Sequence, residues 1–364
     1  MSKLINLQEE KVERAIVFCP IMKDTDKEFQ FAEIERLCIS AHLDLVKIFY
    51  QDSKALIKST FIGSGKVQEI ADFVKLNNID VLVVDEKLTG SQLKNLSDAI
   101  GVKVLDRILL IIDIFALNAN SNEGKIEVKL AQNRYLLTRL SSMQGTQGRY
   151  GGSGAGMRGP GEAKLELDRR KLEEGINSLS KDLEKIKRTR EQNKIARKKA
   201  GIKSVVIGGY TNAGKSSLFN LLTRESIYVQ DKLFATLETT SRRMFLGENK
   251  FCILTDTVGF ISKLPHELVE SFSSTLQEIK DADLVLHVVD VSDKNYEKNI
   301  EITNDILNSI GATNKRIVIL NKTDLVKTPF EVKENEIPFS VKKKTNLEKL
   351  KKAISDMLFS YQNI

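Results

Sequence analysis

The stretch Gly209-Tyr-Thr-Asn-Ala-Gly-Lys-Ser216 decides the fold of the C-terminal part of this chain. It fits the pattern G-x-x-x-x-G-K-[ST], in which a glycine-rich loop wraps phosphates, a lysine reaches the β and γ phosphates, and a hydroxyl coordinates Mg²⁺. Residues 203–208 before it predict a short buried strand, and residues 217–222 after it predict a helix whose N-terminus faces the anion. Because strand, loop and helix come in the required order, a chance glycine-rich turn is the weaker interpretation.

Further motifs of a guanine-nucleotide switch follow the loop in the expected order. A strand at 251–256 runs into Asp256-Thr-Val-Gly259, where the carboxylate can hold Mg²⁺ through water and the Gly259 amide can meet the γ-phosphate. Residues 284–290 and 316–320 predict two buried parallel strands with a helix between them. The second of these strands leads directly into Asn321-Lys-Thr-Asp324. The order of these motifs predicts a Ras-like P-loop domain from residue 201 to the end of the chain.

The last of these motifs selects the base. The Asp324 carboxylate can accept both the N1 proton and the exocyclic amine of guanine, whereas adenine would leave it unpaired, at a cost of about several kcal/mol. Asn321 is expected to tie the loop together, and the Lys322 stem is expected to cover the base. Backbone amides of Ser340-Val-Lys342 are expected to complete the pocket.

Phe234-Ala-Thr-Leu-Glu238 lies between the phosphate loop and the Asp256 motif. It supplies Thr236 as the candidate second magnesium ligand, with Thr239 and Thr240 as rivals. The alternative for Thr236 is an ordinary loop threonine beside a pairing strand.

Phe260 follows the Asp256 motif, where Ras-like switches commonly carry a glutamine that orients the attacking water. A phenyl ring has neither donor nor acceptor. Slow intrinsic hydrolysis is therefore expected, with a catalytic group supplied from elsewhere. The alternative is that Phe260 is simply a core residue of switch II.

Residues 12–115 alternate between strand-like and helix-like segments. Strands are predicted at 15–19, 43–50, 80–85 and 102–106, and helices at 29–41, 65–76 and 91–100. Such alternation predicts a small α/β domain with a mostly parallel sheet. Gly63-Ser-Gly-Lys66 imitates a phosphate loop, but Thr60 replaces the first glycine and Val67 the magnesium-binding hydroxyl. We interpret it as a glycine-rich turn that opens a helix.

From Glu123 the pattern changes to long helices. One apolar face consists of Ile126, Leu130, Leu137 and Leu140 around Asn133, and a second of Leu172, Ile176, Leu179, Leu183 and Ile186. The second set has the spacing of a coiled coil. Residues 144–161 between them contain eight glycines, which excludes helix or strand on composition and predicts an antiparallel helical hairpin with a mobile tip. The tip is either a passive linker or, through Arg149, Tyr150 and Arg158, a contact for RNA phosphates and unstacked bases.

The second long helix becomes basic toward its end. Residues 187–203 carry eight Lys or Arg and the single acid Glu191. A solvated helix face is the usual explanation of such a run, but the neighbouring cationic tip favours RNA contact. The candidate RNA-binding residues are Arg149, Tyr150, Arg158, Lys187, Arg188 and Arg190.

Length and composition set the remaining bounds. The 364 residues suit two or three compact units, and the formal charge of +7 permits a polyanionic partner. Residues 108–117 form the longest apolar run, which is too short to cross a bilayer, and the N-terminus does not have the pattern of a signal peptide. Cys19, Cys38 and Cys252 suggest reduced core residues and have no zinc-ligand spacing. We expect a cytoplasmic, monomeric protein without a membrane span.

Taken together, these motifs resemble the HflX family of ribosome-associated GTPases. Arg158-Gly-Pro-Gly-Glu162, Asp168-Arg-Arg170 and Asp106-Arg107 extend the resemblance over nearly the whole chain. The resemblance implies an N-terminal α/β domain at 1–120, a helical hairpin at 121–200 and a GTPase domain at 201–364. It also favours Thr236 as a magnesium ligand beside Ser216. The chain ends about twenty residues after Thr345, so contacts made by the extra C-terminal domain of some family members are not expected.

The resemblance implies a magnesium-dependent GTP hydrolase that binds the large ribosomal subunit and its rRNA and separates stalled or idle ribosomes. Alternatives are a ribosome-assembly GTPase and a nucleotide-gated RNA-binding module; no cofactor fingerprint supports an RNA-modifying enzyme. Catalytic roles are assigned to Lys215, Thr236 and Gly259, and metal contacts to Ser216 and Thr236, with Asp256 through water. Nucleotide contacts are predicted for Gly209, Tyr210, Thr211, Asn212, Ala213, Gly214, Lys215, Ser216, Phe234, Ala235, Thr236, Leu237, Glu238, Asp256, Thr257, Val258, Gly259, Asn321, Lys322, Thr323, Asp324, Ser340, Val341 and Lys342.

Overall fold

The computed structural model describes residues 12–23, 26–52, 57–147, 160–224, 233–234, 239–247, 250–263, 273–326 and 330–359. Its contacts divide the chain into two compact units. The first consists of Met1–Ile114 with Leu136–Arg169, and the second of Phe115–Tyr135 with Arg170–Ile364. Helices α4 (Arg107–Asn118), α5 (Asn122–Gln147) and α6 (Pro160–Lys199) each contribute residues to both units. The division into three parts at residues 120 and 200 stays a prediction.

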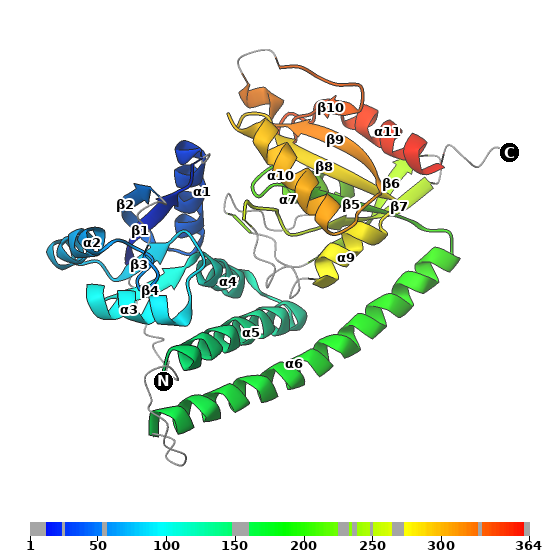
Figure 1. Ribbon diagram of the computed structural model, residues 1–364. Helices are drawn as coiled ribbons and strands as arrows, with labels where there is room; N and C mark the ends of the chain where they lie inside the picture. Colours follow the sequence, from blue (N-terminus) through cyan, green and yellow to red (C-terminus); the bar gives the residue numbers. More distant parts are fainter. Residues whose placement is uncertain are drawn as a thin grey trace, which may run out of the picture. The chain divides into compact units, whose positions relative to one another are not determined.

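The first unit contains a four-stranded parallel sheet in the order β2-β1-β3-β4. The strands are β1 (Arg14–Ile21), β2 (Asp44–Asp52), β3 (Val81–Val84) and β4 (Lys103–Asp106). The connecting helices are α1 (Lys27–Ser40), α2 (Ser64–Asn77) and α3 (Gly90–Ile100). Right-handed crossovers in this order place α1 on one face and α2 with α3 on the other, as Figure 1 shows. The predicted α/β domain is confirmed. Gly63 is the N-cap of α2, which agrees with the interpretation of Gly63-Ser-Gly-Lys66 as a turn that opens a helix.

A buried ionic network joins three elements of this unit. Arg107 at the start of α4 pairs with Asp85 after β3 at 2.5 Å and with Glu33 of α1 at 2.6 Å. Burial lowers the pKa of the Arg107 guanidinium, but the two carboxylates raise that pKa more, so it stands above its ordinary value. Removing one partner would leave a buried charge unpaired, which is strongly destabilising. The network therefore fixes where α4 leaves the sheet.

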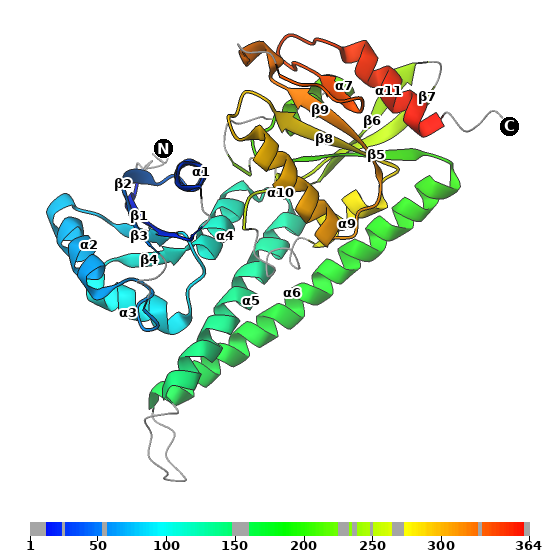
Figure 2. The same cartoon turned by 45° about the horizontal axis from the view of Figure 1, so that its top comes forward.

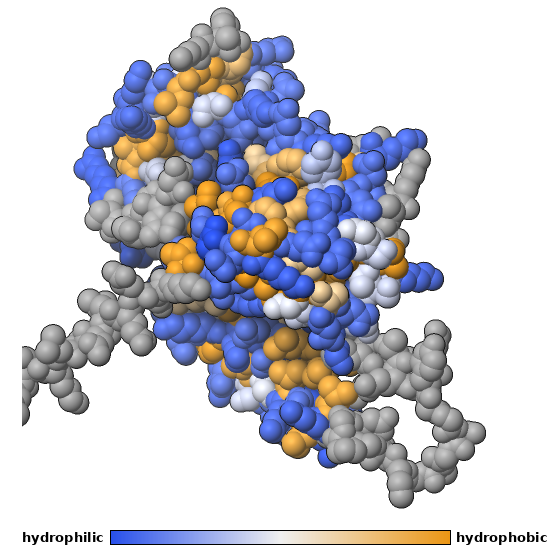
Figure 3. Space-filling view, turned by 90° about the vertical axis from the view of Figure 1, so that its left-hand side faces the viewer, coloured by the Kyte–Doolittle hydropathy of each residue, from blue (hydrophilic) through white to orange (hydrophobic). Residues whose placement is uncertain are grey.

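Two lysines lie over aromatic rings of the edge strand β2. The Nζ of Lys27 lies 5.3 Å from the ring centre of Tyr50, and the Nζ of Lys47 lies 4.6 Å from that of Phe49. Both rings belong to the edge strand β2. Figure 3 shows one face of the molecule, on which hydrophobic residues gather between hydrophilic ones. Tyr50 is exposed and Phe49 is buried, so only the Lys27 contact covers apolar area that this edge strand presents to solvent.

Helices α5 and α6 run antiparallel where both belong to the second unit, as Figure 2 also shows. Glu123 near the start of α5 pairs with Arg190 near the end of α6 at 2.7 Å. Ten residues further along α5, Asn133 lies against Gly175 of α6. A Cβ atom on residue 175 would lie 3.0 Å from the Nδ2 of Asn133. Glycine at 175 thus leaves room for the buried Asn133 side chain. The predicted antiparallel pairing of these helices is confirmed.

The exclusion of helix from residues 144–161 was wrong at both ends of that stretch. Helix α5 continues to Gln147, and α6 begins at Pro160. One glycine, Gly145, costs a helix about 1 kcal/mol, which a helix of 26 residues tolerates, and proline suits a first helical position. Arg149, Tyr150 and Arg158 lie outside the described residues.

The second unit also contains a six-stranded sheet in the order β10-β9-β8-β5-β7-β6, in which β6 is antiparallel to its neighbour and the other pairs are parallel. The strands are β5 (Lys203–Gly209), β6 (Thr240–Gly247), β7 (Lys250–Asp256), β8 (Leu284–Asp290), β9 (Lys315–Asn321) and β10 (Glu336–Pro338). The helices are α7 (Lys215–Thr223), α9 (Ser273–Asp281), α10 (Tyr296–Ser309), η2 (Thr323–Leu325) and α11 (Leu347–Phe359). This is the predicted Ras-like architecture.

Alternate residues of the central strand β5 build the two cores of this sheet. Val205 and Ile207 pack with α7 and α11, while Val206 packs with α9 and α10 on the opposite face. The loops that follow β5, β7, β9 and β10 therefore meet at one edge, outside the carboxyl ends of neighbouring strands.

Two smaller expectations concern the cysteines and the apolar run. All three cysteines are buried, and none forms a disulfide. Burial raises the pKa of the Cys38 and Cys252 thiols to about 12, which makes both unreactive at neutral pH.

The apolar run at residues 108–117 belongs to α4, and most side chains of this helix are buried. Within the part of the chain that the structure describes, no helix has the length and hydrophobicity to cross a membrane.

Candidate nucleotide-binding site

The phosphate loop is held in shape by its neighbours. Gly214 has a φ of 92°, which favours glycine, and α7 begins at the next residue. The Asn321 side chain donates from Nδ2 to the Ala213 carbonyl at 2.9 Å and accepts at Oδ1 from the Val341 amide at 3.2 Å. Asn321 thus joins its own loop to the phosphate loop and to the loop after β10, which is more than the predicted role of tying the loop together. The Val341 amide makes this contact, and its predicted part in the base pocket stays a prediction.

Lys215 lies folded into the loop that it follows. Its side chain is 6% exposed, and Nζ donates to the Tyr210 carbonyl at 2.7 Å. The pKa of this ammonium is lowered to about 8, chiefly by burial; Asp256 opposes the shift, and the Lys322 charge contributes to it. A buried cation with a depressed pKa beside a helix N-terminus is well suited to an anionic ligand.

The magnesium assignment fits the residues that are present. Ser216 Oγ donates to Asp256 Oδ2 at 2.6 Å, so the hydroxyl at the start of α7 meets the carboxylate at the end of β7. Mg²⁺ prefers oxygen ligands, and both groups supply oxygen. Ser216 would coordinate the ion, which would neutralise phosphate charge when bound, and Asp256 would hold its water. Ala235, Thr236, Leu237 and Glu238 lie outside the described residues.

Phe234 begins the segment that contains Thr236 and is itself firmly placed. Its ring is 2% exposed and packs edge-on against Phe115 of α4, with centroids 4.7 Å apart. Asn118 donates from Nδ2 to the Phe234 carbonyl at 2.9 Å. These contacts join residues far apart in the sequence, and no local pattern predicts them.

The Asp256 motif is bonded to the phosphate loop through its last residues. Phe260 donates its amide to the Gly209 carbonyl at 3.0 Å, and the Thr211 amide donates to the Phe260 carbonyl at 2.8 Å. At Gly259 a Cβ would lie 2.8 Å from Lys215 Nζ and 2.7 Å from Thr211 Cγ2, so only glycine fits there. The Phe260 ring packs in the apolar cluster with Val206 and Ile279. Phe260 is therefore a core residue, as the alternative interpretation had it.

Asp324 is oriented by a residue that sequence reasoning placed elsewhere in the pocket. Ser340, fully buried, donates from Oγ to Asp324 Oδ1 at 2.5 Å. This hydrogen bond is the main reason that the pKa of Asp324 lies below its ordinary value, and the Lys343 and Lys342 charges add to it. The carboxylate thus stays ionised, as guanine recognition requires.

Lys322 has a partner that the motif did not predict. Its Nζ pairs with Asp290 Oδ2 at 2.7 Å, and its backbone adopts a φ of 64°. Asp290 ends the predicted strand at 284–290, so its position beside the base loop is a consequence of β8 and β9 being neighbours. The pair holds the end of the Lys322 side chain, and the role of its stem in covering a base stays a prediction.

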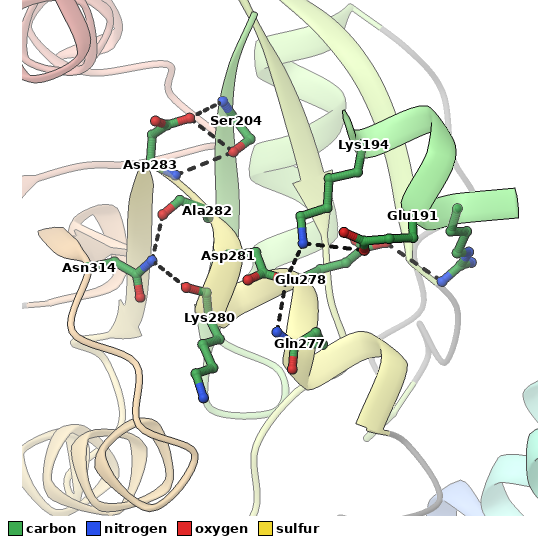
Figure 4. A network of polar contacts seen from close by, with 11 residues as sticks. Glu191, Lys194, Ser204, Gln277, Glu278, Lys280, Asp281, Ala282, Asp283 and Asn314 are labelled. Carbon is green, nitrogen blue, oxygen red and sulfur yellow. Dashed lines mark hydrogen bonds and ion pairs between the residues drawn. The ribbon is translucent and has the colours of Figure 1, made fainter. Parts of the chain in front are cut away.

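The candidate RNA-binding cations of α6 differ in their surroundings. Arg190 pairs with Glu123 and also approaches Glu278 of α9 to 3.6 Å. Lys194, four residues on, pairs with Asp281 at 2.6 Å in the network that Figure 4 shows. By contrast, the Arg188 side chain is 76% exposed, and its ion pair with the exposed Glu184 of the same helix is a long one of 3.8 Å. Part of the basic run thus attaches α6 to α9, and the exposed part remains the candidate for RNA.

Strand order, loop geometry and the four motifs define this chain as a P-loop GTPase with a Ras-like domain. It is 45% identical to GTPase HflX of Caldanaerobacter subterraneus subsp. tengcongensis, over 95% of this chain and 81% of that protein. It is 42% identical to GTPase HflX of Escherichia coli, over 84% and 71% of the two chains. The chain therefore belongs to the HflX GTPase family and is a GTP hydrolase.

Family models and a solved structure agree with this assignment. Residues 28–116 match "GTP-binding GTPase N-terminal", residues 118–197 "GTP-binding GTPase Middle Region" and residues 204–322 "50S ribosome-binding GTPase". The crystal structure of the SsGBP and GDP complex is similar, with 28% identity, a TM-score of 0.52, and coverage of 96% of this chain and 99% of that one. The likeness thus extends over nearly all of the chain.

Replacing Asp324 by Asn should weaken GTP binding at least about tenfold and shift the preference toward xanthine nucleotides, whose C2 oxygen suits an amide donor. The loop should keep its shape, because an amide oxygen can still accept from Ser340. Titration with fluorescent GTP and XTP measures both effects. Asp305→Asn, which removes the same charge from the exposed side of α10, is the control. An unchanged base preference in Asp324→Asn would show that the base pocket lies elsewhere.

Proposed function

We propose that this GTP hydrolase binds the large ribosomal subunit and uses GTP to separate stalled or idle ribosomes into subunits. The main support is the match of residues 204–322 to the model described as "50S ribosome-binding GTPase". Ribosomes are the site of action in this proposal, so the protein would work in the cytoplasm, and a monomer suffices.

The hairpin is the proposed carrier of ribosome affinity. Its cations would neutralise rRNA phosphates, and its aromatic and arginine side chains would stack on unpaired bases. Support comes from the eight basic residues between 187 and 203 and from exposed side chains such as Arg188. Nucleotide contacts would come from the residues at the carboxyl edge of the six-stranded sheet, with Lys215, Thr236 and Gly259 in catalytic roles.

Sedimentation tests the proposed activity directly. Intact ribosomes would be incubated with the protein and GTP, a non-hydrolysable analogue or GDP, and then separated on sucrose gradients. Conversion of ribosomes to subunits in the GTP-bound state supports splitting. Intact ribosomes in all three states, with the protein found only on precursor particles, would instead indicate an assembly GTPase.

Replacing Arg149 and Arg158 together by Ala should weaken binding to large subunits and flatten its salt dependence, because each lost phosphate contact reduces counterion release. GTP affinity should not change. Lys349→Ala with Lys352→Ala removes the same charge from exposed positions of α11 and serves as the control. If the Arg149 and Arg158 variant binds subunits as the wild type does across a salt series, the tip is a passive linker.

A further inference from the structure

The hydroxyl of Thr211 is buried in the phosphate loop without a hydrogen-bond partner among the described residues. The residue is 5% exposed, and its Oγ1 has essentially no contact with solvent. Burying a hydroxyl without a partner is unfavourable, so most such groups in proteins are paired. Such an exception calls for an explanation, and inside a ligand-binding loop a bound ligand is one partner that the group can have.

The position of Thr211 identifies the part of the ligand concerned. Its Cγ2 and the Nζ of Lys215 both lie against Gly259, at 2.7 and 2.8 Å from where a Cβ would stand. Lys215 and the Gly259 amide are the two groups assigned to the γ-phosphate. Thr211 therefore adjoins the end of the site at which hydrolysis occurs, away from the base loop at Asp324.

Neighbouring side chains leave a chemical role open at this end. The Phe260 ring has no polar atom and is enclosed in the apolar cluster of Val206 and Ile279. Tyr210 Oη already accepts from the Ser262 amide at 3.2 Å. A threonine hydroxyl, by contrast, has one hydrogen to donate and two lone pairs to accept with. It can donate to a phosphate oxygen and at the same time accept from a water molecule.

We infer that Thr211 is a catalytic residue whose hydroxyl donates to a γ-phosphate oxygen and accepts from the attacking water. In the reaction the water oxygen bonds to the γ-phosphorus. The bond from that phosphorus to the β,γ-bridging oxygen breaks, and its electron pair leaves with GDP. The protons of water end on the released phosphate and in solvent, and Thr211 only orients the reactants. The loop thereby supplies part of the function that Phe260 lacks.

Thr211→Val tests this inference, because valine keeps the shape of threonine and removes the hydroxyl. Single-turnover hydrolysis by the full chain, without ribosomes, should slow by about a hundredfold to a thousandfold, as for the loss of one transition-state hydrogen-bond donor. Thr211→Ser keeps the hydroxyl and should stay within about threefold of the wild type. GDP affinity should be the same in all three proteins, since GDP lacks the γ-phosphate.

Each other result overturns the inference. Wild-type hydrolysis by Thr211→Val would show that the hydroxyl takes no part. Equal losses in the Val and Ser variants, or GDP affinity that falls together with hydrolysis, would assign Thr211 to packing of the loop. None of these measurements involves ribosomes, so their outcome is independent of the proposed ribosome function.

Discussion

Large ribosomal subunits are expected to raise the single-turnover rate of GTP hydrolysis by about a thousandfold or more, the range known for groups supplied in trans to other GTPases. The reason lies at Phe260. Its ring is 2% exposed and packs in an apolar cluster, so it cannot orient water, and a partner must complete the site. Such a partner would act by ordering the segment after Gly259.

Comparing rates with and without purified large subunits measures the effect. Phe260→Leu is the informative variant, because it keeps an apolar side chain in the cluster, whereas Phe260→Ala would open a cavity at a cost of about 3–5 kcal/mol. Since the ring contributes nothing polar, the leucine variant should show the same stimulation as the wild type. Rapid intrinsic hydrolysis that subunits leave unchanged would contradict a partner-completed active site.

Sequence reasoning succeeded where the information is local. The loop from Gly209 to Ser216 and the motif from Asn321 to Asp324 each follow a buried strand. Since parallel strands present their carboxyl ends at one edge, the predicted strand and motif order is enough to place both motifs at the same edge of the sheet. Their order in the sheet also lets Asn321 join its own loop to the phosphate loop and to the loop after β10.

Contacts between distant segments could not be predicted in this way. The Ser340 hydrogen bond to Asp324, the Asp290 pair with Lys322, and the packing of Phe234 on Phe115 depend on how the sheet and helices are stacked. A single sequence carries no pairing signal for them. The end of α5 was missed for a different reason: composition suggested a loop, but a long helix absorbs the local cost of Gly145.

The second large effect is expected at Lys215. Lys215→Ala should slow hydrolysis by about a thousandfold or to below detection, because the ammonium stands where negative charge develops on the phosphates. Lys215→Met should do the same, since it keeps the stem and removes only the charge. The measurement is single-turnover hydrolysis at saturating GTP, with Lys198→Met on the exposed end of α6 as the control.

The pH dependence of GTP binding tests the same group without relying on catalysis. In the nucleotide-free protein the pKa of Lys215 is lowered to about 8, chiefly by burial. Phosphates beside the ammonium would raise that pKa, so binding takes up a proton above pH 8 and none below. Affinity should be nearly constant from pH 6.5 to 7.5 and then fall by about tenfold for each further unit while the bound lysine stays charged. Lys215→Met should lose this slope, although titration of guanine at higher pH will be common to both proteins.

The same pKa shift affects the free energy of unfolding in the opposite sense. In the folded, nucleotide-free state Lys215 is neutral above pH 8, whereas in the unfolded chain it stays charged to about pH 10.5. Unfolding then binds a proton, so Lys215 makes the free energy of unfolding rise between these pH values in the wild type and not in the methionine variant. Identical pH profiles for binding in the two proteins would show that Lys215 does not meet the phosphates.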